Sequence, residues 1–111
     1  MDILENYREL VRNILLKYAG YKPSNGNIEP GVIFDLERDR YELMHVGWDG
    51  QQRIHGSVVH IDIIDSKIWI QHDGTNIAIA EELVELGVPA EDIILGFHPP
   101  NVRQYTDFGV A

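Results

Sequence analysis

The spacing of apolar residues changes once in the first part of this 111-residue chain, from the period of a helix to the period of a strand. This change restricts the fold more than any single motif. Between residues 2 and 19 apolar side chains recur every three or four positions, as on one face of an amphipathic helix: Ile3, Tyr7, Leu10, Val11, Ile14, Leu15 and Tyr18. Gly20 is a residue that commonly ends a helix. We therefore predict a helix over residues 2–19, followed by a loop through the Pro-, Gly- and Asn-rich segment YKPSNGNIEPG.

From Val32 onward the apolar residues alternate with polar ones. This pattern predicts four strands: Val32–Glu37, Tyr41–Trp48, Arg53–Ile64 and Lys67–His72. The connections RDR, DGQQ and DS are short and polar, as hairpin turns require, so the strands should form an antiparallel meander. Gly56, inside the third strand, predicts a bend or bulge.

Helical spacing returns after the strands. We predict a second helix over Asn76–Leu86, capped by Thr75 or Asp73 and ended by Gly87, with Val88 making the apolar contact just beyond. The residues expected to face the core are Ile77, Ala80, Leu83 and Val84.

The C-terminal region should hold a short edge strand at IILGF and one helical turn at Pro100. Several of its side chains are too apolar to stay in water, so the segment should pack on the sheet or on a second subunit: Phe97, Val102, Tyr105 and Phe108. The length suits one domain. We thus predict a single α+β domain over residues 1–111, an antiparallel sheet of four or five strands with both helices on one face.

The composition excludes several classes of function. There is no cysteine, which excludes disulfides, thiolate nucleophiles and cysteine-based metal sites. The net charge of −9, with the nine basic residues scattered, makes direct nucleic-acid binding unfavourable. Acidic residues interrupt any apolar run near the N-terminus, and no span is long enough to cross a membrane. We expect a soluble, cytoplasmic protein.

The stretch from His45 to Asp65, HVGWDGQQRIHGSVVHIDIID, places His60 and Asp62 within strand sequence. A two-residue turn at Asp65 and Ser66 would set His60 opposite Gln71 and Asp62 opposite Trp69. Strand alternation then gives one apolar face for the helices, formed by Val59, Ile61, Ile63, Ile68 and Ile70. The other face is mixed in chemistry: Val58, His60, Asp62, Ile64, Lys67, Trp69 and Gln71.

A mixed face of this kind has three interpretations: plain cross-strand packing, a protein-binding or dimer surface, or a small-molecule or metal site. The candidate partner-binding residues are those of this face and of the C-terminal segment: His60, Asp62, Trp69, Gln71, His98, Arg103 and Tyr105. His60, Asp62 and His98 could alternatively form a two-histidine, one-carboxylate iron site with Arg103 beside it. No serine lies in a nucleophile elbow, which argues against hydrolase chemistry.

Three motifs carry a family resemblance: VGWDG, HIDIIDSKIWIQHDGT and LGFHPP. Together with YRELVRNILLKYA near the N-terminus they resemble the XisI family, the fdxN element excision controlling factors, over nearly the whole chain. Ser66 stands where the family pattern suggests glycine in the tight turn. The resemblance implies an accessory protein in the excision of a DNA element from a cyanobacterial genome, acting beside a site-specific recombinase and a nuclease-like companion, XisH. It supplies no catalytic residues and no cofactor.

Two hypotheses therefore follow. The first is a non-enzymatic controlling factor, expected to be a homodimer, that binds a nuclease-like or recombinase protein through the mixed face or the C-terminal segment. The second is a metal- or ligand-binding enzyme that uses His60, Asp62 and His98.

Overall fold

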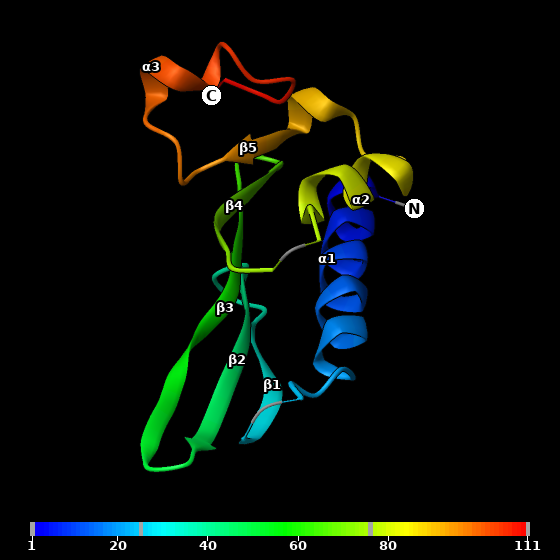
Figure 1. The fold of residues 1–111 in the computed structure, drawn as a ribbon. Helices are drawn as coiled ribbons and strands as arrows, with labels where there is room; N and C mark the ends of the chain where they lie inside the picture. The colour runs from blue at the N-terminus through cyan, green and yellow to red at the C-terminus, as the bar shows by residue number, and fades with distance from the viewer. Residues whose placement is uncertain (1, 25, 76, 111) are drawn as a thin grey trace.

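The protein is an open five-stranded sheet with helices against one face (Figure 1). The computed structural model describes residues 2–24, 26–75 and 77–110. The strands follow the spatial order β1-β2-β3-β4-β5, and each pairing is antiparallel except the last, in which β5 runs parallel to β4. Their bounds are β1 Asn27–Asp35, β2 Arg40–Asp49, β3 Gln52–Ile64, β4 Lys67–Asp73 and β5 Ile93–Leu95. The helices are α1 Ile3–Ala19, α2 Ile79–Glu85, α3 Pro100–Arg103 and the short 3-10 helix η1 Ala90–Asp92.

Helix α1 confirms the N-terminal prediction. The Asp2 carboxylate caps it by accepting a hydrogen bond from the Leu4 N–H at 3.1 Å, and the chain leaves the helix at Gly20. Its apolar stripe is buried against the sheet: Tyr7, Val11, Ile14, Leu15 and Tyr18. Within the described residues, no helix is both long and apolar enough to cross a bilayer.

The first strand begins earlier than predicted. It starts at Asn27, inside the segment interpreted as a loop, and ends at Asp35 rather than Glu37. Pro30 lies within it, paired with His45. A proline is tolerated there because β1 is an edge strand with a neighbour on one side only. The Asp35 carboxylate accepts hydrogen bonds from the main-chain N–H groups of Glu37 and Arg38. Glu37 therefore belongs to the turn and not to the strand.

The predicted division of the β3–β4 hairpin into two unlike faces is confirmed. Asp62 lies opposite Trp69, and Ile61 opposite Ile70, as the two-residue turn requires. The predicted apolar face is buried in the core cluster together with residues of α1 and α2: Val59, Ile61, Ile63, Ile68 and Ile70. Burial of each such side chain contributes roughly 1.5–3 kcal/mol to folding. Both helices lie on this side of the sheet (Figure 1).

Two strand irregularities correct the predicted register. Between β2 and β3 the pairing passes from Leu43–Val59 to Met44–Ser57, so Val58 is an extra residue. It packs against the core instead of joining the mixed face. The bulge therefore lies two residues after Gly56, where a bend was expected. Between β3 and β4 the extra residue is Gln71, and His60 consequently pairs with His72 rather than Gln71.

The second helix is shorter than predicted. Within the described residues it begins at Ile79, since Asn76 lies outside them and Ile77 precedes the helix. Ile77 and Val84 are 45% and 40% exposed, so their predicted core positions are wrong; the buried residues are Ile79, Ala80 and Leu83. Because Ile77 precedes the helix, the buried face is set by Ile79, Ala80 and Leu83, and Val84 lies beyond the edge of that face.

The N-cap of α2 is Ala78 rather than the predicted Thr75 or Asp73, although Asp73 still contacts the start of the helix, and the C-terminal end is as predicted. The Asp73 carboxylate accepts a hydrogen bond from the Ile79 N–H at 3.3 Å and so satisfies a donor at the start of the helix. Gly87 has a φ of 105°, and the buried Val88 donates its N–H to the Leu83 oxygen just beyond it.

The C-terminal segment confirms the edge strand and the helical turn at Pro100. It differs in that β5 is parallel to β4, which the intervening α2 and η1 allow by carrying the chain back along the sheet. Helix α3 lies on the side of the sheet away from α1, and the chain beyond it returns across the end of the sheet toward η1 (Figure 1). Val102 and Phe108 are partly buried, but Phe97 and Tyr105 are 49% and 83% exposed.

Candidate protein-binding face of the sheet

The face of the sheet away from α1 and α2 carries a regular ladder of cross-strand pairs. Tyr41 and Leu43 are buried in the core, so alternation turns their even-numbered neighbours on β2 to the opposite side. We call this surface the open face and define it by five β2–β3 pairs and one residue of β4: Arg40–Asp62, Glu42–His60, Met44–Ser57, Val46–His55, Trp48–Arg53 and Trp69.

The polar part of the open face centres on Asp62. His60 Nε2 lies 2.8 Å from Asp62 Oδ1, and Gln71 Nε2 donates to Asp62 Oδ2 at 3.2 Å. Because an ionised carboxylate only accepts hydrogen bonds, Nε2 is the protonated ring nitrogen of His60 in this pair. The other ring nitrogen, Nδ1, lies 4.0 Å from Glu42 Oε1. Asp62 is only 8% exposed, and hydrogen bonds to both of its oxygens compensate for its burial.

Trp69 is covered by the C-terminal segment. The Arg103 guanidinium lies 5.0 Å from the centre of the Trp69 ring, and Arg103 Nε donates to the His98 main-chain oxygen at 3.0 Å. Arg103 is 9% exposed. This contact fastens the last helical turn to the sheet. The placement gives Arg103 and Trp69 a structural role, and their partner-binding role stays a prediction.

The other predicted residues of the C-terminal segment do not join this network. The His98 ring packs against Phe97, with ring centres 4.7 Å apart, and Tyr105 extends into solvent. Among the residues that the structure describes, no three His, Asp or Glu side chains are grouped so as to hold a metal ion. The predicted set of His60, Asp62 and His98 is thus not brought together.

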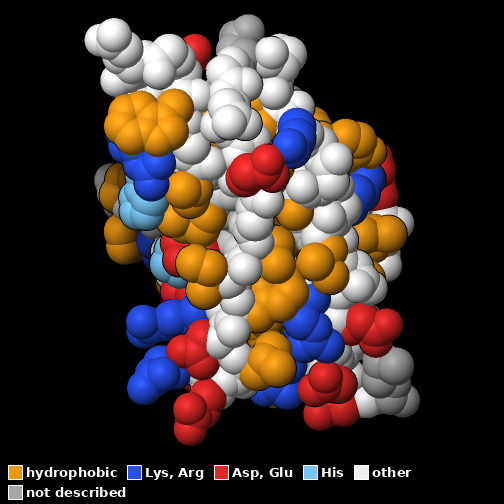
Figure 2. All heavy atoms as spheres, turned by 90° about the horizontal axis from the view of Figure 1, so that it is seen from below, with side chains coloured by type: hydrophobic (Ala, Val, Ile, Leu, Met, Phe, Trp, Pro, Cys, Tyr) orange, Lys and Arg blue, Asp and Glu red, His pale blue; other side chains and the backbone are white. Residues whose placement is uncertain are grey.

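The end of the open face near the β2–β3 turn was not singled out from the sequence. Trp48 is 50% exposed, and the Arg53 guanidinium stacks on it at 5.2 Å from the ring centre. A shallow hollow of about 360 Å³ runs along β3 beside Arg53 and His55. Figure 2 views the molecule from this end and shows histidine side chains at one margin beside hydrophobic and basic ones. The alternation of Tyr41 and Leu43 was the signal that could have placed Met44 and Trp48 here.

The strongest electrostatic interactions lie away from the open face and hold the fold together. Arg8 on α1 donates two hydrogen bonds to Asp39, at 2.8 and 3.0 Å, and this guanidinium holds the pKa of Asp39 below its ordinary value. Burial, helped by its hydrogen bond to Asp39, raises the pKa of Tyr41 to about 12. Burial and a hydrogen bond to Asp92 likewise raise the pKa of Tyr7 to about 12. These contacts attach α1 to the β1–β2 turn and to η1.

Comparison with known proteins supports the family resemblance that the sequence motifs indicate. The family model described as XisI protein matches residues 1–110. One similar crystal structure is a XisI-like protein from Anabaena variabilis ATCC 29413, with 50% identity and a TM-score of 0.90 over 97% of this chain and 99% of that one. Another is the fdxN element excision controlling factor XisI from the same organism, with 38% identity and a TM-score of 0.81 over 99% of this chain and 100% of that one. No curated protein matches. The chain therefore belongs to the XisI family.

Proposed function

We propose that this chain is a non-enzymatic controlling factor for the excision of a DNA element, and that it acts by binding a protein through its open face. The role in excision is supported by a relative that is named as the fdxN element excision controlling factor. The partner that the family resemblance implies is a nuclease-like protein of the XisH type, or else the site-specific recombinase that carries out strand exchange.

The observation that supports a protein partner most directly is the chemistry of the open face. A half-exposed Trp48 stacked on Arg53 lies on the same surface as Met44, His60 and Glu42. Tryptophan and arginine dominate the energetics of protein interfaces, and methionine is also enriched there. Trp48 on this face is half-exposed, whereas on the opposite face Leu43, Val59 and Ile61 are buried in the core cluster with residues of α1 and α2.

The charge pattern favours a protein over a nucleic acid. A duplex is bound by clustered Lys and Arg that displace counterions from its phosphates. On the open face, Arg40 is paired with Asp62 across the strands, and Glu42 lies beside His60, so acidic groups accompany the basic ones. With the net charge of −9, direct reading of DNA by this surface is disfavoured.

The test is binding of the purified chain to its XisH-type companion, measured by calorimetry for the unaltered protein and for Trp48→Ala. Trp48 is a better probe than Trp69, because Trp69 supports Arg103 and its loss would disturb the C-terminal segment. Loss of a central interface tryptophan costs about 2 kcal/mol or more, which weakens binding roughly thirtyfold. The matched control is Leu16→Ala on α1, a residue of equal exposure at 51%, which should leave the affinity unchanged.

Two results would contradict the proposal. One is unchanged affinity in Trp48→Ala for both the XisH-type protein and the recombinase. The other is steeply salt-dependent binding of duplex DNA by the chain alone, which would indicate a DNA reader. Light scattering on the same samples tests the predicted homodimer, and fractionation of cells tests the predicted cytoplasmic location.

A further inference from the structure

A groove separates α2 from the C-terminal segment, on the helix-covered side of the molecule rather than on the open face. Its main cavity measures about 330 Å³, at the low end of the roughly 300–1,000 Å³ of typical ligand sites. The lining residues are Glu81, Val84, Glu85, Ala90, Asp107 and Phe108. A second cavity of about 160 Å³ adjoins the first and shares Glu81 and Phe108 with it, and we call the two together the groove.

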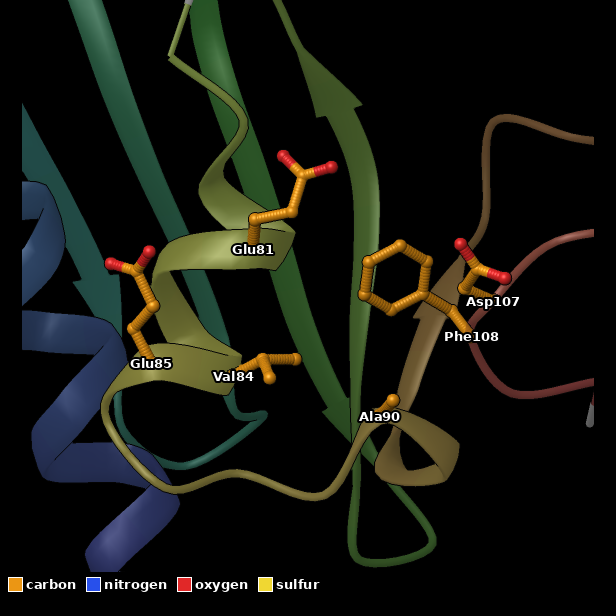
Figure 3. A pocket seen from close by; sticks show the side chains of 6 residues that line it. All are labelled: Glu81, Val84, Glu85, Ala90, Asp107 and Phe108. Atoms are coloured by element: carbon orange, nitrogen blue, oxygen red, sulfur yellow. The ribbon is translucent and has the colours of Figure 1, made fainter.

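The floor of this groove is apolar and partly open to solvent. Val84 and the Phe108 ring point toward one another from opposite walls, with Ala90 between them at one end (Figure 3). Val84 is 40% exposed although the adjacent Leu83 is fully buried, and Phe97 at the far end is 49% exposed. Apolar side chains gathered in a hollow are better covered by another molecule than left in water.

The rim of the groove is acidic. Glu81 and Glu85 lie one turn apart on α2, and Asp107 stands across from them beside Phe108 (Figure 3). Among the described residues none of these three carboxylates makes an ion pair or accepts a hydrogen bond. Glu82, on the same helix but facing α1, pairs with Lys17 and Tyr18 instead. Like charges at i, i+4 on a helix repel, so a cation that neutralised Glu81 and Glu85 would relieve that repulsion.

We propose that this groove binds a basic amphipathic segment of a partner protein, which places an apolar side chain against Val84 and Phe108 and Lys or Arg side chains against the acidic rim. The charges select this occupant. A nucleic acid or an acidic peptide would be repelled by three carboxylates, and a second copy of the chain, with its own net charge of −9, would bring more negative charge. A purely apolar segment would leave the three carboxylates of the rim without cationic partners. This inference does not depend on what the open face binds.

The probe is a synthetic peptide of about 16 residues, with leucines at helical spacing and lysines at the other positions. The peptide is titrated into the isotope-labelled full chain, and binding is followed by NMR. Chemical-shift changes should concentrate on residues 81–85 and 107–108. The same peptide with glutamates in place of lysines should not bind. Spermidine, a cation without an apolar face, should bind far more weakly than the lysine peptide.

Matched variants separate the two parts of the site. Replacing Glu81 and Glu85 by Gln should weaken binding of the lysine peptide about tenfold at low salt and reduce its salt dependence. The paired control replaces the exposed Glu9 and Glu37 by Gln, with the same change in net charge and no expected effect beyond a small long-range one. Val84→Ala should weaken binding severalfold, whereas Ile64→Ala, at the similar exposure of 41%, should not.

The proposal is overturned by any of four results. The first is that the lysine peptide does not bind at concentrations up to about 1 mM, and the second is that the glutamate peptide binds as tightly as the lysine peptide. The third is that chemical-shift changes are confined to the open face. The fourth is that spermidine binds with the same affinity as the lysine peptide. If the XisH-type protein fails to bind the open face, the peptide test of the groove still stands, since the two tests use different surfaces and different probes.

Discussion

Replacing Arg103 by Gln tests whether the C-terminal segment is anchored through Trp69. Arg103 makes two contacts: its guanidinium lies 5.0 Å from the Trp69 ring centre, and its Nε donates to the His98 oxygen at 3.0 Å. The side chain is 9% exposed, so both contacts are shielded from water.

The expected loss follows from these two contacts. A hydrogen bond from a charged group contributes about 1.5–3 kcal/mol, and a shielded cation–π contact about 0.5–2 kcal/mol. Glutamine keeps an amide donor and some contact with the ring, so we expect a net loss of about 2–3 kcal/mol in the free energy of unfolding. For a domain of this size that lowers Tm by roughly 8–12 °C.

The chain contains its own control. Arg53 stacks on Trp48 at 5.2 Å, nearly the same distance, but on an exposed site. Arg53→Gln should therefore cost less than about 1 kcal/mol. Both variants are measured by urea unfolding with tryptophan fluorescence as the signal. If the two variants lost the same free energy of unfolding, or if Arg103→Gln lost none, burial would not be what makes the Arg103–Trp69 pair strong.

Two further predictions concern the β1–β2 region. Arg8→Gln should destabilise the protein at neutral pH, because Arg8 donates two hydrogen bonds to Asp39 and holds the pKa of that carboxyl below its ordinary value. That stabilisation is complete above the unfolded-state pKa of about 3.9 and is lost as the pH falls through the lower folded-state pKa, so the difference between variant and parent in urea unfolding should shrink as the pH is lowered through the acid range. Gly47→Ala should destabilise the protein by more than about 2 kcal/mol and expose β1 to hydrogen exchange, since a Cβ there would lie 2.1 Å from a main-chain oxygen of β1. Gly56→Ala, where a Cβ meets nothing within 4 Å, should change stability by less than about 1 kcal/mol, and a large loss there would contradict the steric explanation.

The parts of the fold that could be predicted are those fixed by local spacing. The faces of the β3–β4 hairpin follow from a period of two and a two-residue turn, and burial of Ile61 and Ile70 confirms them. The start of β1 could not be predicted, because Pro30 disfavours a strand unless the strand lies at an edge, and edge position is a property of the whole sheet. The bulges at Val58 and Gln71 likewise depend on how neighbouring strands pair.

The part of the candidate site that follows from strand alternation could likewise be predicted. Alternation correctly put His60 and Asp62 on one face. It placed Gln71 opposite His60, whereas the bulge lets Gln71 reach Asp62 instead. The stacking of Arg103 on Trp69 joins residues far apart in the sequence, and no local pattern indicates it. The groove beside α2 was missed because it requires Val84 to be exposed, and helical spacing had placed Val84 in the core.

The most direct test of the central claim uses the two tryptophans of the chain, both of which lie on the open face. In a Trp69→Phe variant, which unlike an alanine variant keeps an aromatic ring against Arg103, Trp48 is the sole indole and is 50% exposed in the free protein. Iodide quenching of its fluorescence is measured with and without a saturating amount of a non-fluorescent, tryptophan-free XisH-type protein. Burial of Trp48 against the partner should shift its emission to the blue and protect it strongly from iodide in the complex. Formation of the complex with unchanged quenching of Trp48 would show that the partner binds elsewhere.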